Sequence, residues 1–114
     1  MAVNSKDKGK RYELEVVSDL KSYGYNDVKR SVQYCGNNDD ANNADVVGLD
    51  GIHIECKHYK NKAFSYEWIN QAVRDSACSD NLPAVFHRVN NEKTVVTMQL
   101  DDWMKLYKAY RDAF

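Results

Sequence analysis

The chain has 114 residues, which fits one domain spanning 1–114 and is too short for two independent hydrophobic cores. Hydrophobic residues make up 43% and charged residues 29%, a balance that excludes both a disordered polyelectrolyte and a membrane protein. The net charge of −1 gives no basic surplus of the kind that nucleic-acid-binding proteins commonly carry, although basic residues gather in the first 30 positions and acidic residues between positions 39 and 55.

The N-terminus and the cysteines bear on location. No stretch approaches the roughly 18 consecutive apolar residues of a membrane span, and residues 1–11 carry charges with no apolar segment behind them, unlike a secretory signal. The three cysteines, Cys35, Cys56 and Cys78, include no C-x-x-C pair, so we expect free thiols rather than a disulfide framework or a zinc site. We therefore expect a cytoplasmic protein without membrane contact, in the host cytoplasm if the source is viral.

The first third of the chain predicts a helix, a strand and a loop. Residues 8–24 carry apolar side chains at helical spacing, and Gly24 is placed to end the helix in a left-handed turn. Residues 27–34 are rich in β-forming residues and predict a strand. The density of Asn, Asp and Gly in residues 35–44 predicts a loop.

A hairpin is predicted next. Residues 45–49 and 52–58 predict two short strands around Asp50-Gly51, a strong turn signal. In the second strand the apolar residues alternate with ionisable ones, Ile52, Ile54 and Cys56 against His53, Glu55 and Lys57. We therefore expect one face of this strand to point into the core and the other to present ionisable groups.

The second half predicts a helix, two strands and a last helix, over residues 65–79, 83–89, 93–100 and from 101 onward. Ser65 can cap the first of these helices, and Asp101 or Asp102 the second. The apolar residues of the last helix are expected either to pack on the sheet of their own chain or to form a dimer surface: Trp103, Leu106, Tyr107 and Tyr110. The order α-β-β-β-α-β-β-α predicts an α+β or mixed α/β domain.

The pattern Asp45-x9-Glu55-Cys56-Lys57 is the candidate for chemistry. Two carboxylates that converge at the end of a hairpin can hold one or two Mg²⁺ ions, and the carbonyl of Cys56 is a further candidate ligand. Lys57 lies on the face of Glu55, where a charge pair would keep its ammonium protonated to orient water or offset charge on a phosphorane. By itself the pattern also fits an ordinary exposed hairpin, with the Cys56 side chain in the core.

The register of the hairpin decides whether the two carboxylates meet. A two-residue loop turns Asp45 away from Glu55. A three-residue loop over 49–51 pairs Asp45 with Glu55 and places both beside Lys57, with Gly51 supplying the positive φ that such loops require. We predict this three-residue loop or an equivalent bulge.

Asp45, the Glu55-Cys56-Lys57 triplet and the order αβββαβ resemble the restriction-endonuclease-like nuclease superfamily, whose motif is PD followed by (D/E)-x-K. Ala44 stands where that family often has proline, a small departure because the proline is not a ligand. The segment KGKRYELE, residues 8–15, is similar to the opening of archaeal-type Holliday junction resolvases, K-G-x-x-x-E-x-E. The resemblance implies a restriction-endonuclease-like core, a central mixed sheet flanked by helices, with an extra strand and a C-terminal helix.

The resemblance also implies further site residues. It makes Glu13 a third carboxylate at the metal, with Glu15 a structural neighbour, and it makes Arg30 and Ser31 contacts of DNA phosphates. Each of these also has an ordinary explanation as a solvated surface residue. It further implies DNA contact by Lys8, Gly9, Lys10, Arg11 and Gln71.

The function implied by the resemblance is Mg²⁺-dependent hydrolysis of DNA, with Mn²⁺ able to substitute. The N-terminal match favours a phage-encoded Holliday junction resolvase that acts as a homodimer in DNA recombination and repair. Its substrate would be a four-way DNA junction. A restriction-type, repair or flap-processing nuclease would use the same active site. A catalytically inactive nucleic-acid-binding domain and a protein without nucleic-acid contact stay open as alternatives of another class.

Overall fold

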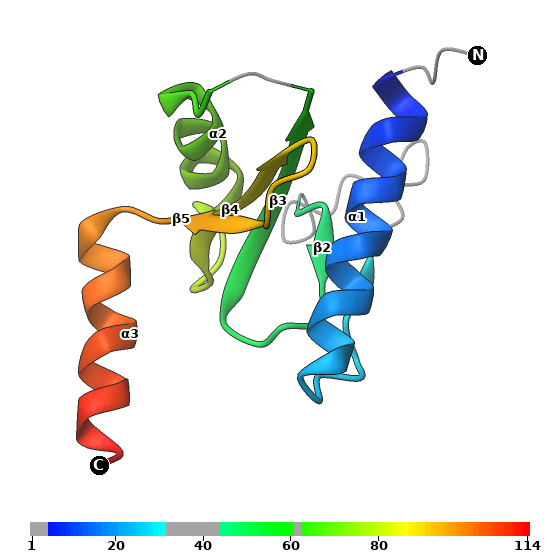
Figure 1. Ribbon diagram of the computed structural model, residues 1–114. Coiled ribbons are helices and arrows are strands. Elements are labelled where there is room, and N and C mark those ends of the chain that lie inside the picture. The colour runs from blue at the N-terminus through cyan, green and yellow to red at the C-terminus, as the bar shows by residue number, and fades with distance from the viewer. Residues whose placement is uncertain (1–4, 32–43, 61–62) are drawn as a thin grey trace.

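The computed structural model describes residues 5–31, 44–60 and 63–114. In this part of the chain the elements are α1 Ser5–Ser22, β1 Lys29–Arg30, β2 Val46–Val47, β3 Ile52–Tyr59, α2 Tyr66–Ser76, β4 Leu82–Val89, β5 Val95–Thr97 and α3 Leu100–Asp112 (Figure 1). The predicted order of helices and strands is confirmed. Their arrangement is that of a mixed α/β protein, consistent with a restriction-endonuclease-like core.

The five strands form one mixed sheet in the order β1-β2-β3-β4-β5. The pairs β1/β2, β2/β3 and β4/β5 are antiparallel, whereas β3 and β4 run parallel over their whole length, from Ile52 beside Leu82 to Tyr59 beside Val89. A parallel pair needs a crossover connection, and α2 supplies it. The two longest strands therefore form the centre of the sheet.

Helices cover both faces of this centre (Figure 1). On one face Tyr12, Val16 and Val17 of α1 pack against Val46 and Ile54. On the other face Trp68, Ile69 and Ala72 of α2 pack against Val85 of β4. Two thin cores on opposite faces leave the central strands without a solvated side.

The double coverage corrects the expectation that β3 has one ionisable face outside the core. His53 and Glu55 are each only 2% exposed. They lie on the face that α2 covers, because their neighbours Ile54 and Cys56 point to the α1 side. The ionisable residues of this strand are therefore largely removed from water.

The ends of several elements differ from the sequence prediction. Gly24 ends α1 at a φ of +102°, as predicted, but Tyr23 is 79% exposed. Of the strand predicted over 27–34, residues 27–31 are described and only Lys29–Arg30 forms a strand, whereas residues 32–34, Cys35 and the predicted loop up to residue 43 lie outside the described residues. Cys56 and Cys78 are free thiols, as predicted.

Both helix caps were tested by the structure. Ser65 is the N-cap of α2 and accepts a hydrogen bond from the Glu67 N–H at 3.2 Å, as predicted. The cap predicted for the last helix is wrong: α3 starts at Leu100, before both candidate caps, with Gln99 at the N-cap and no side-chain hydrogen bond there. Asp101 and Asp102 lie instead in its first turn, where their negative charge favours the positive end of the helix dipole.

The helix α3 has no buried residue and extends away from the sheet beyond β5 (Figure 1). The first of the two alternatives for its apolar residues, packing on its own sheet, is therefore not what the structure shows. None of the helices in the described part of the chain is long and apolar enough to cross a membrane.

Candidate active site

The β2–β3 hairpin has the register that brings the two carboxylates together. Val46 pairs with Ile54, as in the predicted register, and Asp45 lies close enough to Glu55 for a side-chain hydrogen bond. The Ile52 N–H donates to the Leu49 carbonyl at 3.1 Å across Asp50-Gly51, so the turn itself has two residues, and Gly51 has a φ of +86°. Residues 47–49 on the β2 side lie opposite only residues 52 and 53 of β3, so a bulge on the β2 side sets the register. The equivalent bulge, and not the three-residue loop, is therefore what the structure shows.

A second glycine of the hairpin, Gly48, also has a positive φ, +97°. A Cβ at this position would lie 2.2 Å from the backbone oxygen of Asp27. Only a residue without a side chain lets β2 approach the segment before β1 so closely. Gly48 thus positions the strand that leads back to Asp45, and the sequence analysis did not identify it.

Asp45 is held by hydrogen bonds on three sides. Its N–H donates to the Ile54 carbonyl at 2.9 Å, and its own carbonyl accepts from the Ser31 N–H at 2.9 Å. Its side-chain Oδ2 accepts from the Cys56 N–H at 2.8 Å. The carboxylate is therefore aimed at the middle of β3 by both its backbone and its side chain.

The pKa of Asp45 is raised to about 7. Burial is the largest cause, and the nearby charge of Glu55 and a side-chain hydrogen bond with Glu55 add to it. The Cys56 N–H and the ammonium of Lys57 act in the opposite direction. Two like charges thus meet in a partly desolvated place, and a bound cation would relieve their repulsion.

Glu55 lies near Asp45 and also near two further polar residues, His53 and Asp75. Its Oε1 is 2.9 Å from His53 Nε2, and both side chains are 3% exposed. The ligand atoms of His53, Glu55 and Asp75 lie within 4.8 Å of one another. His53 and Asp75 were missed in the sequence analysis.

Two sequence signals pointed to His53 and Asp75. His53 stands two residues before Glu55 and therefore shares its face of the strand. Asp75 stands four residues after Gln71, on the same face of α2. Neither signal predicts that α2 packs over this part of β3.

Glu13 reaches the site from α1 and is paired with a cation. Arg30 Nε donates to Glu13 Oε1 at 2.8 Å, and the two side chains are 31% and 19% exposed. Burial and the charge of Asp45 raise the pKa of Glu13, while Arg30 lowers it. A cavity of about 250 Å³ is lined by Glu13, Arg30, Ser31, Ala44 and Asp45.

This cavity joins residues that the sequence analysis assigned to different roles. Two carboxylates assigned to the metal share it with the arginine and the serine assigned to a DNA phosphate. The structure thus brings Glu13, Arg30, Ser31 and Asp45 together.

Lys57 follows Glu55 on the same face of β3 and contacts α2. Its Nζ donates to Gln71 Oε1 at 3.3 Å. Among the ion pairs of the described residues none joins Lys57 to Glu55, so the charge pair expected from the sequence is not observed. Gln71 instead orients the ammonium, which still lies close enough to Asp45 to lower its pKa.

The basic residues predicted at DNA lie on α1, on the turns that precede Glu13. Lys10 and Arg11 are exposed, whereas Lys8 and Gly9 are half-buried. Burial, the charge of Arg88 and the charge of Lys8, in that order, lower the pKa of His58, so Lys8 lies near that imidazole. Lys10 and Arg11 are thus open to solvent on the helix that carries Glu13.

The donor set fits a hard divalent cation. Carboxylate oxygens are the preferred ligands of Mg²⁺, and Asp45 and Glu55 present theirs from adjacent strands, with Glu13 near Asp45. The imidazole of His53 is a softer ligand and already lies within hydrogen-bond distance of Glu55. Its chemistry suits holding Glu55 in place better than binding Mg²⁺.

The raised pKa of Asp45 leads to an expected pH dependence of the metal-free protein. Because the pKa in the folded state lies above the usual aspartate value of 3.8, the contribution of Asp45 to stability is full below about pH 4 and is lost as the pH rises through about 7. Urea unfolding in EDTA between pH 4 and 8 should therefore show the wild type losing stability relative to Asp45→Asn. Asp101→Asn, an exposed carboxyl on α3, is the control and should follow the wild type. If the difference in the free energy of unfolding between wild type and Asp45→Asn stayed constant from pH 4 to 8, the raised pKa of Asp45 would be contradicted.

Comparison with models of protein families matches residues 4–113 to the family described as "phage putative PDDEXK endonuclease". The match covers nearly the whole chain and includes every residue of the candidate site. The searches of curated proteins and of solved structures found no match.

Proposed function

Because the chain belongs to the phage PDDEXK endonuclease family, we propose that it is a Mg²⁺-dependent endonuclease that hydrolyses phosphodiester bonds of DNA. Nucleases of this kind generally use divalent metals. The observation that carries the proposal is the approach of the Asp45 carboxyl group to that of Glu55, with Lys57 two residues beyond Glu55 on the same face of β3. We take the whole chain, residues 1–114, as one nuclease domain.

In this proposal Asp45, Glu55 and Glu13 hold the metal, with the carbonyl of Cys56 as a further ligand. A bound Mg²⁺ would supply Lewis-acid charge at the scissile phosphate and lower the pKa of a bound water. The hydrogen bond from the Cys56 N–H keeps Asp45 Oδ2 in a fixed position, so little reorganisation is needed when the cation binds. The imidazole of His53 lies within hydrogen-bond distance of Glu55 Oε1 and would hold that carboxylate in place.

Two cationic side chains would act on the phosphate. Lys57 places its ammonium on the face of the carboxylates, where it orients the attacking water and offsets the negative charge that grows in the transition state. Gln71 holds that ammonium at 3.3 Å. Arg30 uses Nε for Glu13, so its terminal Nη groups would be the ones that contact a phosphate, with Ser31 beside it.

The finer part of the proposal concerns the substrate. The similarity of residues 8–15 to the opening of archaeal-type Holliday junction resolvases supports a four-way junction as the substrate. Two symmetric cuts across such a junction need two active sites, which supports a homodimer. Mn²⁺ is expected to replace Mg²⁺, while Ca²⁺ should support binding without turnover because its coordination is larger and looser.

A panel of DNA substrates tests this function. A synthetic four-way junction, linear duplex and flap DNA are incubated with the full chain in Mg²⁺, Mn²⁺, Ca²⁺ or EDTA. Paired symmetric nicks on the junction alone are expected. Cleavage of duplex or flap instead would keep the active site and move the function to restriction or repair. Cleavage in EDTA would contradict the mechanism, and no metal-dependent cleavage on any substrate would leave a binding domain.

A further inference from the structure

The last helix of the chain exposes an apolar stripe. Its members are spaced alternately three and four residues apart, which places them on one side of the helix: Leu100, Trp103, Tyr107, Tyr110 and Phe114. The rings follow one another in contact, with centroids 5.4 Å apart for Trp103 and Tyr107 and 4.9 Å apart for Tyr110 and Phe114. All five side chains are exposed, from 43% for Tyr107 to 86% for Phe114. We call these five residues the α3 stripe.

The α3 stripe is unusual for a free surface. Of the thirteen large hydrophobic residues that are exposed in the described part of the chain, nine lie between residues 95 and 114. A helix of 13 residues is also near the lower limit at which a helix is stable in water without packing. Both facts indicate that something covers the stripe.

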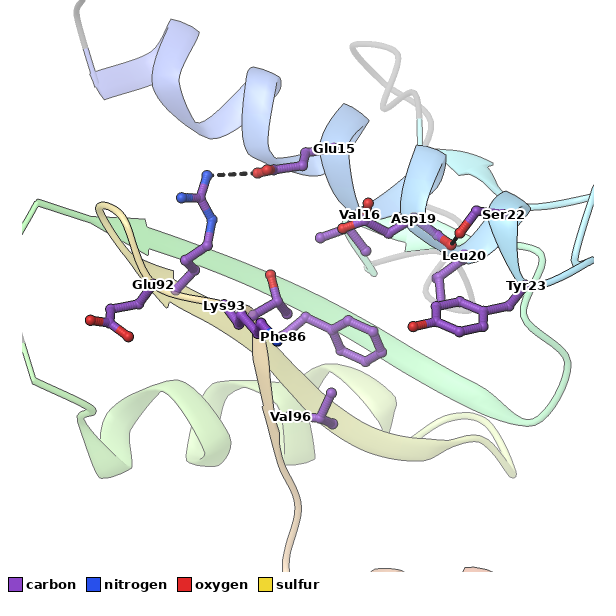
Figure 2. Close-up of a pocket in the computed structure, with 12 residues that line it drawn as sticks. Glu15, Val16, Asp19, Leu20, Ser22, Tyr23, Phe86, Glu92, Lys93 and Val96 are labelled. Carbon is purple, nitrogen blue, oxygen red and sulfur yellow. Dashed lines mark hydrogen bonds and ion pairs between the residues drawn. The ribbon is translucent and has the colours of Figure 1, made fainter.

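A groove elsewhere on the same chain has the complementary character. It lies between α1 and the β4–β5 hairpin, has a volume of about 620 Å³ and is drawn in Figure 2. Its apolar lining comes from both sides, with Val16 and Leu20 on α1, Tyr23 just after that helix, and Phe86 and Val96 on the two strands. We call it the α1–β5 groove.

The groove has an acidic excess, whereas the C-terminal half of the stripe has basic neighbours. Three acidic residues, Glu15, Asp19 and Glu92, line the groove beside two basic ones, Arg88 and Lys93, and Arg88 is paired with Glu15 at 2.7 Å. On α3 the residues beside the stripe in its C-terminal half are basic, Lys108 and Arg111. A helix seated in the groove would therefore place cations near acidic residues.

The groove is not filled by the helix of its own chain. The connection from β5 to α3 consists of Met98 and Gln99, and Gln99 is extended, with φ −67° and ψ 148°. It leads α3 away from the sheet, so that the helix and the groove of one chain are separated (Figure 1). An extended connection of this kind is the arrangement in which two copies exchange a terminal element.

We propose that the α3 stripe of one copy of the chain docks into the α1–β5 groove of a second copy, reciprocally, to form a two-fold symmetric dimer. The inference rests on the homodimer of the proposed function and names its interface. Four aromatic side chains at about half exposure offer roughly 400 Å², and Leu100, Met104, Leu106 and the groove wall raise the buried area of each copy toward roughly 800 Å², the size of a stable interface.

Two matched pairs of variants test the interface in the full chain. Tyr107→Glu places a charge in the stripe, and Ala109→Glu places the same charge on the opposite side of the helix. Val96→Asp places a charge in the groove, and Val95→Asp places it on the other face of the same strand. All four positions are exposed, so the substitutions leave the fold intact, which circular dichroism checks.

Sedimentation equilibrium without DNA is the measurement. The wild type is expected to be a dimer at micromolar concentration, with Tyr107→Glu and Val96→Asp each weakening association by at least roughly 100-fold and the two controls by less than about threefold. A monomeric wild type, or controls that dissociate as strongly, would overturn the proposal. Dissociation by Tyr107→Glu without an effect of Val96→Asp would overturn the groove as the docking site. Because association is read without DNA or metal, this test fails or succeeds independently of cleavage.

Discussion

Replacement of Glu55 by glutamine is expected to lower metal-dependent DNA cleavage by on the order of 10³-fold or more. The substitution keeps the size of the side chain and one oxygen to face His53, but it removes the negative charge that the cation requires. DNA binding should persist or become tighter, because less negative charge faces the phosphates. Single-turnover cleavage in Mg²⁺ and a binding titration in Ca²⁺ separate the two effects.

Glu67→Gln is the matched control for this experiment. Glu67 lies in the first turn of α2 and forms an ion pair with Arg74 at 2.8 Å, with both side chains more than 60% exposed. Its replacement should leave cleavage unchanged, since an exposed ion pair contributes little to stability and lies outside the site. Wild-type cleavage by Glu55→Gln would remove the proposed metal site, and so would an equal loss in the control.

The second large effect is expected from Gly48→Ala. A methyl group there would meet the Asp27 backbone oxygen at 2.2 Å, and alanine disfavours the φ of +97°. The conformational cost of about 1–2 kcal/mol and an overpacking cost of about 1–3 kcal/mol together predict a loss of about 3 kcal/mol in the free energy of unfolding. Because whole domains are stabilised by only about 5–15 kcal/mol, urea unfolding will detect this change easily.

Gly51→Ala separates the two causes. Gly51 also has a positive φ, +86°, but a Cβ there has no neighbour within 4 Å. This variant should lose only the conformational part, about 1 kcal/mol. Equal losses in the free energy of unfolding for the two variants would show that the close approach of Gly48 to Asp27 does not add to the cost of a side chain at residue 48.

The parts of the fold that the sequence predicted are those decided by neighbours along the chain. The turn at Asp50-Gly51 and the alternation of side chains in β3 both act within a few residues, and together with the predicted alternative of a bulge they gave the pairing of Val46 with Ile54. The cap at Ser65 is likewise local. Burial of Tyr12 and Val16 follows from their spacing on one helix face.

The parts that were missed depend on contacts between distant segments. His53 and Asp75 meet at Glu55 only because α2 crosses over β3, and the ion pair of Glu13 with Arg30 exists only because α1 lies beside β1. The positive φ at Gly48 depends on the approach of Asp27. The exposure of α3 could not be predicted either, because the same apolar spacing suits packing on the chain's own sheet or on another copy.

The connection between β2 and β3 imposes a rule of parity on any chain that keeps this site. Side chains alternate between the two faces of a strand, so one residue inserted into or removed from the turn would exchange the faces and carry Asp45 to the α1 side, away from Glu55. Two added residues, one on each strand, would return the side chains of Asp45 and Glu55 to the same face of the sheet. Relatives that retain the chemistry are therefore expected to differ from the nine-residue interval between Asp45 and Glu55 in steps of two, and an odd step should coincide with a compensating bulge.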